Sequence, residues 1–133
     1  MKIQASAEDY LEAILVLSQK KDKVRAVDIA QHMGFSKPTI SIIMKQFREN
    51  DYIEIDSDRC IHLTVKGGEI ARSTYERHML FANFLMDIGV DEETAYRDAC
   101  KIEHNISETS FQKLKTFYDN YFKIYSHNYL DSN

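Results

Sequence analysis

The hydrophobic pattern of this chain is mostly that of amphipathic helices. Apolar residues recur at three- and four-residue spacing along most of the 133 residues, and only four glycines and one proline interrupt them. We expect six helices, which span about residues 6–20, 26–33, 36–49, 66–88, 91–105 and 107–121. Between the third and fourth helices, residues 52–55 and 60–63 alternate apolar and polar positions, which predicts a β-hairpin.

The order of these elements predicts the fold. A helix, a glycine turn at Gly34, a second helix and then a hairpin is the order of a winged helix-turn-helix. The expected class is mainly α with a small β-hairpin: a winged helix-turn-helix domain over 1–65, a helical dimerisation domain over 66–125 and a frayed tail over 126–133. The apolar residues expected to supply the dimer contact are Leu80, Phe81, Phe84, Leu85, Leu114, Phe117 and Tyr118.

Composition and charge narrow the class of protein. The apolar content of 44% is ordinary for a globular protein. A net charge of −4 disfavours indiscriminate nucleic-acid binding by bulk charge, but it permits a local basic face. Two cysteines make no disulfide scaffold, the polar start is not a signal peptide, and no apolar run approaches a membrane span. These features favour a cytoplasmic protein with no membrane partner.

The third predicted helix would enter the major groove of DNA by its N-terminal end. Its hydroxyls suit phosphates or base edges and its lysines supply charge. The candidate contacts are Ser36, Lys37, Pro38, Thr39, Ser41 and Lys45, together with Arg59 at the hairpin tip. Asp56 and Asp58 in the same tip oppose a strongly bound wing. A plain solvated helix face is the alternative, but the position of the hairpin favours DNA binding. A winged domain normally binds as a dimer, so we expect a palindromic double-stranded operator with half-sites about 34 Å apart.

Potential metal ligands gather on three of the predicted helices. The six candidates are Asp9, Glu12, His78, Cys100, Glu103 and His104. Cys100, Glu103 and His104 stand at i, i+3 and i+4, so their side chains leave one helix face. Thiol, imidazole and carboxylate groups are the ligands of divalent transition metals. Each residue alone has an ordinary explanation as a first-turn acid, a satisfied histidine or a buried thiol, whereas the combination favours metal binding by the second domain.

Seven motifs follow one another in a characteristic order and spacing. They are Glu8-Asp9-Tyr10-Leu11-Glu12-Ala13-Ile14, Asp28-Ile29-Ala30, Ser36-Lys37-Pro38-Thr39-Ile40-Ser41, Leu63-Thr64-Val65-Lys66-Gly67, Arg77-His78 with Leu80 and Phe84-Leu85, Gly89-Val90-Asp91-Glu92-Glu93, and Ile102-Glu103-His104 with Ile106-Ser107. In these motifs residues 6–121 resemble the diphtheria-toxin-repressor and manganese-transport-regulator family. The resemblance implies a homodimeric bacterial repressor with Mn(II) or Fe(II) as corepressor, no enzymatic activity and no small organic substrate.

The resemblance also implies which residues hold the metal. In the manganese branch the positions matching the six candidates form a two-metal cluster, with Glu in place of Cys100. The iron branch has Cys there but Met in place of Asp9, and ligands of its ancillary site would fall at Ala82 and Tyr96, which replace them poorly. A thiolate is softer than a carboxylate and favours Fe(II), Co(II) or Zn(II) over Mn(II). We therefore expect one well-formed site and a weaker second ion at Glu12.

The expected mechanism is metal-dependent repression. A divalent cation would tie the first helix, under the DNA-reading helices, to the dimerisation domain and so fix the spacing of the two recognition helices. Three alternatives remain open. They are a winged-helix regulator that is not controlled by metal, a redox-sensitive regulator centred on Cys100, and a metalloenzyme that uses the same ligands but shows no separate general base or substrate pocket.

Overall fold

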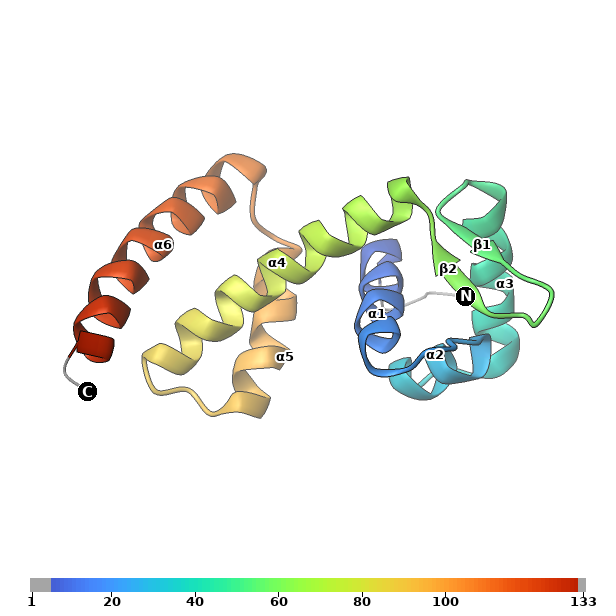
Figure 1. The fold of residues 1–133 in the computed structure, drawn as a ribbon, viewed down its shortest axis with the longest axis horizontal. Coiled ribbons are helices and arrows are strands. Elements are labelled where there is room, and N and C mark those ends of the chain that lie inside the picture. Colours follow the sequence, from blue (N-terminus) through green and yellow to red (C-terminus); the bar gives the residue numbers. More distant parts are fainter. Residues whose placement is uncertain (1–5, 132–133) are drawn as a thin grey trace. The chain divides into compact units, whose positions relative to one another are not determined.

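The computed structural model describes the backbone of residues 6–131 and the side chains of residues 6–121. Predictions for residues 1–5 and for the last two residues of the tail lie outside this range. The described elements are α1 (Ala7–Lys20), α2 (Ala26–Met33), α3 (Lys37–Glu49), β1 (Ile53–Ile55), β2 (Ile61–Leu63), α4 (Val65–Asp87), α5 (Glu92–Glu103) and α6 (Glu108–Asp131) (Figure 1). The mainly α class with one small hairpin is as predicted.

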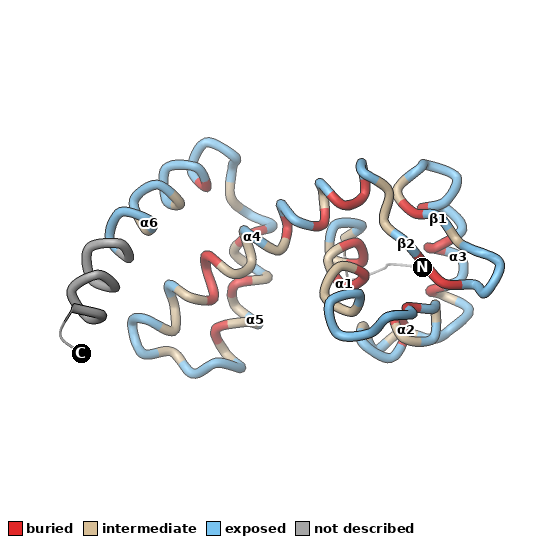
Figure 2. The backbone as a smooth tube through the Cα atoms, viewed as in Figure 1, coloured by how far each residue is buried: buried red, intermediate tan, exposed pale blue. Residues whose placement is uncertain are grey.

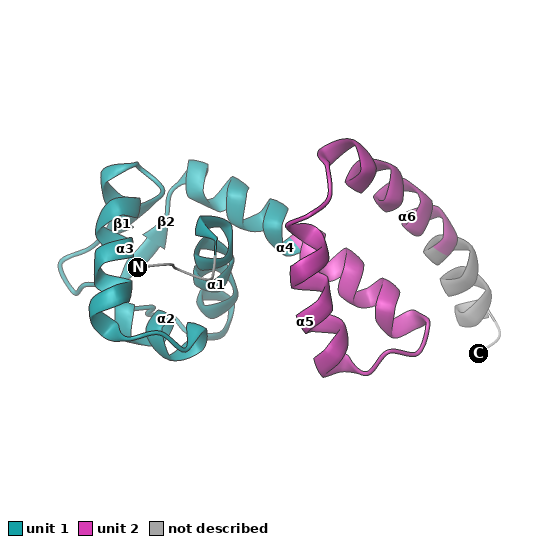
Figure 3. Cartoon of the chain, turned by 180° about the vertical axis from the view of Figure 1, so that it is seen from behind, with its two compact units in different colours: residues 1–75 teal, residues 76–133 magenta. Residues whose placement is uncertain are grey.

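The chain forms two compact units, Met1–Tyr75 and Glu76–Asn133, and α4 runs from the first into the second (Figure 3). The first unit therefore extends beyond the predicted domain boundary at residue 65. The reason is that the first turns of α4 carry Ile70 and Ala71, which pack into the core of the first unit. None of the helices in the described residues combines the length and the apolar character needed to cross a membrane.

Side-chain caps start α1 and α3. The Ser6 side chain accepts the Asp9 backbone N–H, and the Asp9 carboxylate accepts the Ser6 N–H, so both ends of a capping box are present at α1. Ser36 caps α3 in the same manner by accepting the Thr39 N–H. Gly34 ends α2 with φ +75°, a conformation in which a side chain would be strained.

The core of the first unit joins α1, α2 and α3 to the hairpin (Figure 2). Tyr10 on α1 is almost fully buried, and its ring lies 6.3 Å from that of Phe47 on α3 and 6.0 Å from that of Phe35. The strands pair antiparallel with Glu54 opposite His62, which turns the apolar neighbours of both residues toward this core. The position of α1 and that of α3 are thereby set by one packed interior.

The second unit packs α4, α5 and α6 around a smaller core. Its buried residues are Leu80, Phe81, Ala82, Ala99 and Phe111. Ion pairs join α4 to α6, with Arg77 bonded to Glu108 and Lys115 to Glu76. The Arg77 guanidinium also lies 4.8 Å from the centre of the Phe111 ring, a cation–π contact.

The end of α6 differs from the prediction. The sequence predicted a helix end near residue 121 and a frayed tail over 126–133, whereas the helix continues to Asp131. From Glu108 onward the sequence contains no glycine or proline, the residues that most strongly end a helix. The polarity of the tail was a misleading signal, because polar residues are compatible with an exposed helix.

We expect Gly67→Ala to destabilise the protein by more than about 2 kcal/mol, because a Cβ on Gly67 would overlap the Tyr52 backbone carbonyl. The matched control is Gly68→Ala, whose Cβ would meet only the mobile end of Arg72, 3.1 Å away. That change should stabilise α4 by about 0.5–1 kcal/mol. Urea unfolding of both variants at one protein concentration tests this, and equal midpoints would contradict it.

Candidate metal centre and nucleic-acid interface

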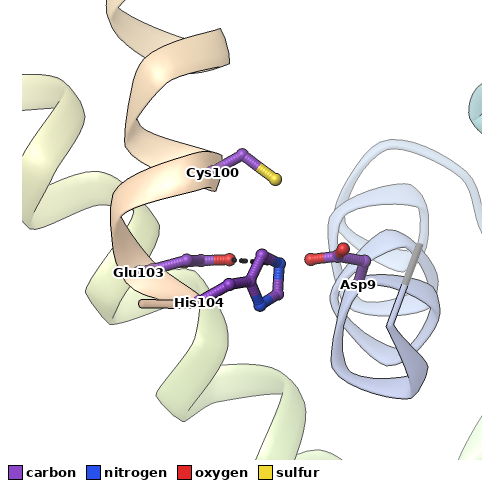
Figure 4. Close-up of side chains that lie close together, drawn as sticks. All are labelled: Asp9, Cys100, Glu103 and His104. Atoms are coloured by element: carbon purple, nitrogen blue, oxygen red, sulfur yellow. Dashed lines mark ion pairs between the residues drawn. The ribbon is translucent and has the colours of Figure 1, made fainter. Parts of the chain in front are cut away.

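The last turn of α5 and its C-cap residue, His104, carry three potential metal ligands on one face (Figure 4). Cys100, Glu103 and His104 offer donor atoms that lie within 4.8 Å of one another, and the His104 Nε2 is 3.6 Å from the Glu103 Oε1. Two donors that share one ion, with bonds of about 2.0–2.3 Å, lie at most about 4.6 Å apart. Small side-chain rotations are therefore enough for all three to reach one metal.

His78 brings a second helix of the same unit to this cluster. His78 and Glu103 offer donor atoms within 4.8 Å of each other. The His78 Nε2 lies 3.0 Å from the backbone carbonyl oxygen of Tyr96. Because a carbonyl only accepts hydrogen bonds, Nε2 carries the proton and Nδ1 has the lone pair. The hydrogen bond to Tyr96 fixes the imidazole in a form that can ligate a metal.

The other two predicted ligands, Asp9 and Glu12, belong to the first unit. They lie three residues apart on α1, so their side chains leave the same face, and both are partly buried. Asp9, labelled on α1 in Figure 4, also completes the capping box with Ser6. The structure thus gathers Cys100, Glu103 and His104, places His78 beside Glu103, and carries the remaining two predicted ligands together on α1.

The donor set of the second unit fits a divalent transition metal. A thiol and an imidazole beside a carboxylate suit ions of borderline softness, whereas Mg²⁺ and Ca²⁺ prefer oxygen ligands only. Glu103 is 4% exposed, so its negative charge has little solvent to stabilise it. A cation at the cluster would supply the compensation that a buried carboxylate requires. The residues therefore fit a metal by chemistry, by burial and by spacing.

The predicted DNA contacts lie at the exposed N-terminal part of α3. Pro38, Ser41 and Lys45 are exposed along one side of the helix. Ser36 and Thr39 are less available, because their hydroxyls bond each other at 2.8 Å and the Ser36 oxygen also caps α3. Ser41 is therefore the hydroxyl of this predicted set best placed for an outside partner.

Basic residues line an open cleft of about 600 Å³ in the first unit, bounded by α3, the start of α2 and the hairpin. Its five basic side chains are Arg25, Lys37, Lys45, Arg48 and Arg59. Asp56 is the one acidic side chain among the described residues that line it. This local excess contrasts with the net charge of −4 of the whole chain and suits the phosphates of a nucleic-acid backbone.

Hydrogen bonds fix the shape of the hairpin tip. The Asp56 Oδ1 accepts the backbone N–H groups of Asp58 and Cys60 at 2.9 Å, and Oδ2 lies 2.9 Å from the His62 Nε2. The hydrogen bond with His62 and then the backbone bonds lower the pKa of Asp56. The Asp56 carboxylate therefore holds the turn together.

Comparison with known proteins decides the family. The family model described as iron dependent repressor, N-terminal DNA binding domain, matches residues 2–61, and its metal binding and dimerisation domain matches residues 64–123. A transcriptional regulator MntR of Escherichia coli is 36% identical over 110 residues, 83% of this chain and 71% of that protein. The chain belongs to the diphtheria-toxin-repressor and manganese-transport-regulator family.

Two further relatives agree with this family. An HTH-type transcriptional regulator MntR of Bacillus subtilis is 34% identical over 109 residues, 82% of this chain and 77% of that protein. The structure of the manganese regulator SloR matches with a TM-score of 0.76 and 30% identity, over 88% of this chain and 55% of that one. The chain thus spans about half the length of that solved protein.

Family membership confirms several predictions and removes one alternative. The family consists of DNA-binding, metal-dependent transcriptional regulators with a dimerisation domain, as the sequence resemblance implied. Its members are repressors rather than enzymes, so the metalloenzyme alternative is wrong. The identity of the ligand and DNA-contacting residues stays a prediction.

Sequence reasoning missed two of the basic residues in the cleft. Arg48 stands three residues after Lys45 on α3, and this spacing could have identified it. Arg25 precedes α2, and its Nε donates to the Asp58 carbonyl 3.1 Å away, which ties the start of α2 to the hairpin tip. A contact across 33 positions leaves no local signal in the sequence.

We expect Co(II) titration to reveal Cys100 as a ligand. Thiolate coordination gives Co(II) an intense near-ultraviolet charge-transfer absorption, which should appear in the parent protein and be lost in Cys100→Ala. Cys60→Ala is the matched control, because Cys60 is buried in the first unit and belongs to no potential metal cluster among the described residues. An absorption that survives in Cys100→Ala would contradict this assignment.

The cleft predicts a further change in DNA binding. Arg48→Gln should weaken binding to all duplexes alike and reduce the slope of log K against log [salt] by about 0.9, the value of one phosphate contact. Lys20→Gln, which removes a cation at the exposed end of α1 outside the cleft, should leave the slope unchanged. Binding isotherms at several salt concentrations measure the slope, and identical slopes for the two variants would refute the prediction.

Proposed function

We propose that this protein is a cytoplasmic, homodimeric repressor of metal-homeostasis genes that binds a palindromic operator when it holds a divalent cation of the Fe(II)/Mn(II) class. The observation that carries the proposal is the cluster of Cys100, Glu103 and His104 in the domain matched by the metal-binding family model. The proposed ligands are Asp9, Glu12, His78, Cys100, Glu103 and His104.

The proposed cation acts through charge. Asp9 and Glu12 on α1 are negative, and so is Glu103 on α5, so the two sets of acids repel when no cation is present. The proposed ligands of α1 and of the second unit would hold a divalent cation, which would supply the compensating positive charge. Cation binding would therefore lower the free energy of the arrangement in which α1 is tied to the dimerisation domain, relative to the arrangement in which it is not.

Packing in the first unit explains how α1 would influence DNA binding. Tyr10 lies between the two proposed ligands of α1 in sequence, and its buried ring packs against Phe47 of α3. Since protein interiors are close-packed, α1 and α3 move as one body. Fixing α1 to the dimerisation domain therefore fixes the recognition helix of each subunit.

An apolar groove in the second unit supports self-association. The groove, of about 250 Å³, is lined by residues of α4, α5 and α6 and has no polar surface. Phe84, Leu114 and Phe117 line it and remain 42% to 66% exposed. A second copy that covers this face would supply the second recognition helix that a pair of half-sites about 34 Å apart requires. Metal binding then selects the spacing that matches the operator, with a coupling of about 1–3 kcal/mol.

We expect chelation to abolish specific DNA binding and added Mn(II), Co(II), Zn(II) or anaerobic Fe(II) to restore it. With metal added, Asp9→Asn should bind DNA about 5- to 150-fold more weakly than the parent does. The neutral amide keeps a hydrogen-bond acceptor for the α1 cap but weakens the metal bond. Fluorescence anisotropy with a duplex selected from a random pool measures the affinity.

The matched control is Glu8→Gln, which makes the same charge change at the neighbouring exposed position of α1. Glu8→Gln should retain the full metal response. Equal DNA binding before and after chelation would instead favour the winged-helix regulator without metal control. A full metal response in Asp9→Asn would remove Asp9 from the site.

A further inference from the structure

The outer face of α3 exposes one isoleucine that the fold does not use. Ile42 is 60% exposed, whereas Ile40 and Ile43 on the same helix are buried. An exposed β-branched side chain adds less to helix stability than alanine does. Neither the core nor helix propensity therefore accounts for isoleucine at this position.

The surroundings of Ile42 are polar. Pro38, Ser41, Ile42 and Lys45 are spaced i, i+3, i+4 and i+7, so they share one exposed face of α3. Ser41 and Lys45 also line the basic cleft. A protein-docking surface normally needs a continuous apolar patch, and a single isoleucine among a proline, a hydroxyl and a cation is not one.

This combination suits a base edge in the major groove. The groove presents hydrogen-bonding groups on every base pair, and its one apolar feature is the C5-methyl group of thymine. An isoleucine forms no hydrogen bond and gains free energy only by burying apolar surface. A neighbouring hydroxyl and ammonium group can hold phosphates or adjacent base edges at the same time.

We propose that Ile42 contacts the methyl group of a thymine and so specifies thymine at one position of each operator half-site. The inference rests on the DNA-binding function proposed above. It concerns sequence preference, which is separate from the metal dependence of binding.

The test uses a duplex selected from a random pool by the Mn(II)-loaded parent protein. Each thymine is replaced in turn by 2′-deoxyuridine, which lacks only the methyl group. At one thymine position of each half-site, the single replacement should weaken binding by the parent about fourfold. This loss corresponds to about 0.8 kcal/mol for one buried methyl. Ile42→Ala should bind thymine and deoxyuridine at that position equally, and Ile42→Val should lie between the two.

Val65→Ala is the control, since it shortens another exposed aliphatic side chain of the first unit, which is 78% exposed and lies outside α3. This variant should keep the parent's discrimination. If every replacement weakens the parent and Ile42→Ala equally, the inference is overturned while the metal response stands. If discrimination depends on Ile42 but binding ignores chelation, the inference holds and metal control fails.

Discussion

A buried carboxylate has to be compensated, and in this protein the acid concerned is Glu103 in the last turn of α5. Its side chain is almost inaccessible to water, and its near neighbours include the thiol of Cys100 and the imidazole of His104. Thiol, imidazole and carboxylate together are a donor set that fits a divalent transition metal, which would add positive charge beside the buried acid. The hydrogen bond between His78 and the Tyr96 carbonyl prepares another ligand for the same purpose.

The first unit is organised to convert a constraint on α1 into a constraint on DNA recognition. Tyr10 and Phe47 lock α1 to α3, while Arg25 ties α2 to the hairpin tip that Asp56 shapes. Each of these contacts lies within the unit, so the recognition helix and the basic cleft form one preset surface. In the proposed mechanism the metal would control one variable, the position of that surface in the dimer.

Helical periodicity allowed the sequence to predict the elements, and their order predicted the winged helix-turn-helix. The i, i+3, i+4 spacing of Cys100, Glu103 and His104 predicted their common face for the same geometric reason. Features that depend on tertiary contacts were not predictable. The Tyr96 carbonyl that orients His78 and the cleft position of Arg25 have no local signal, and the end of α6 was misplaced because polarity alone does not stop a helix.

We propose that a metal ion joins the two units into one body. Residual dipolar couplings of backbone amides measure the orientation of each unit separately, in metal-free protein and in protein loaded with diamagnetic Zn(II). We expect two different alignment tensors without metal and one common tensor with Zn(II). A common tensor in the absence of metal, or two tensors in its presence, would contradict the claim.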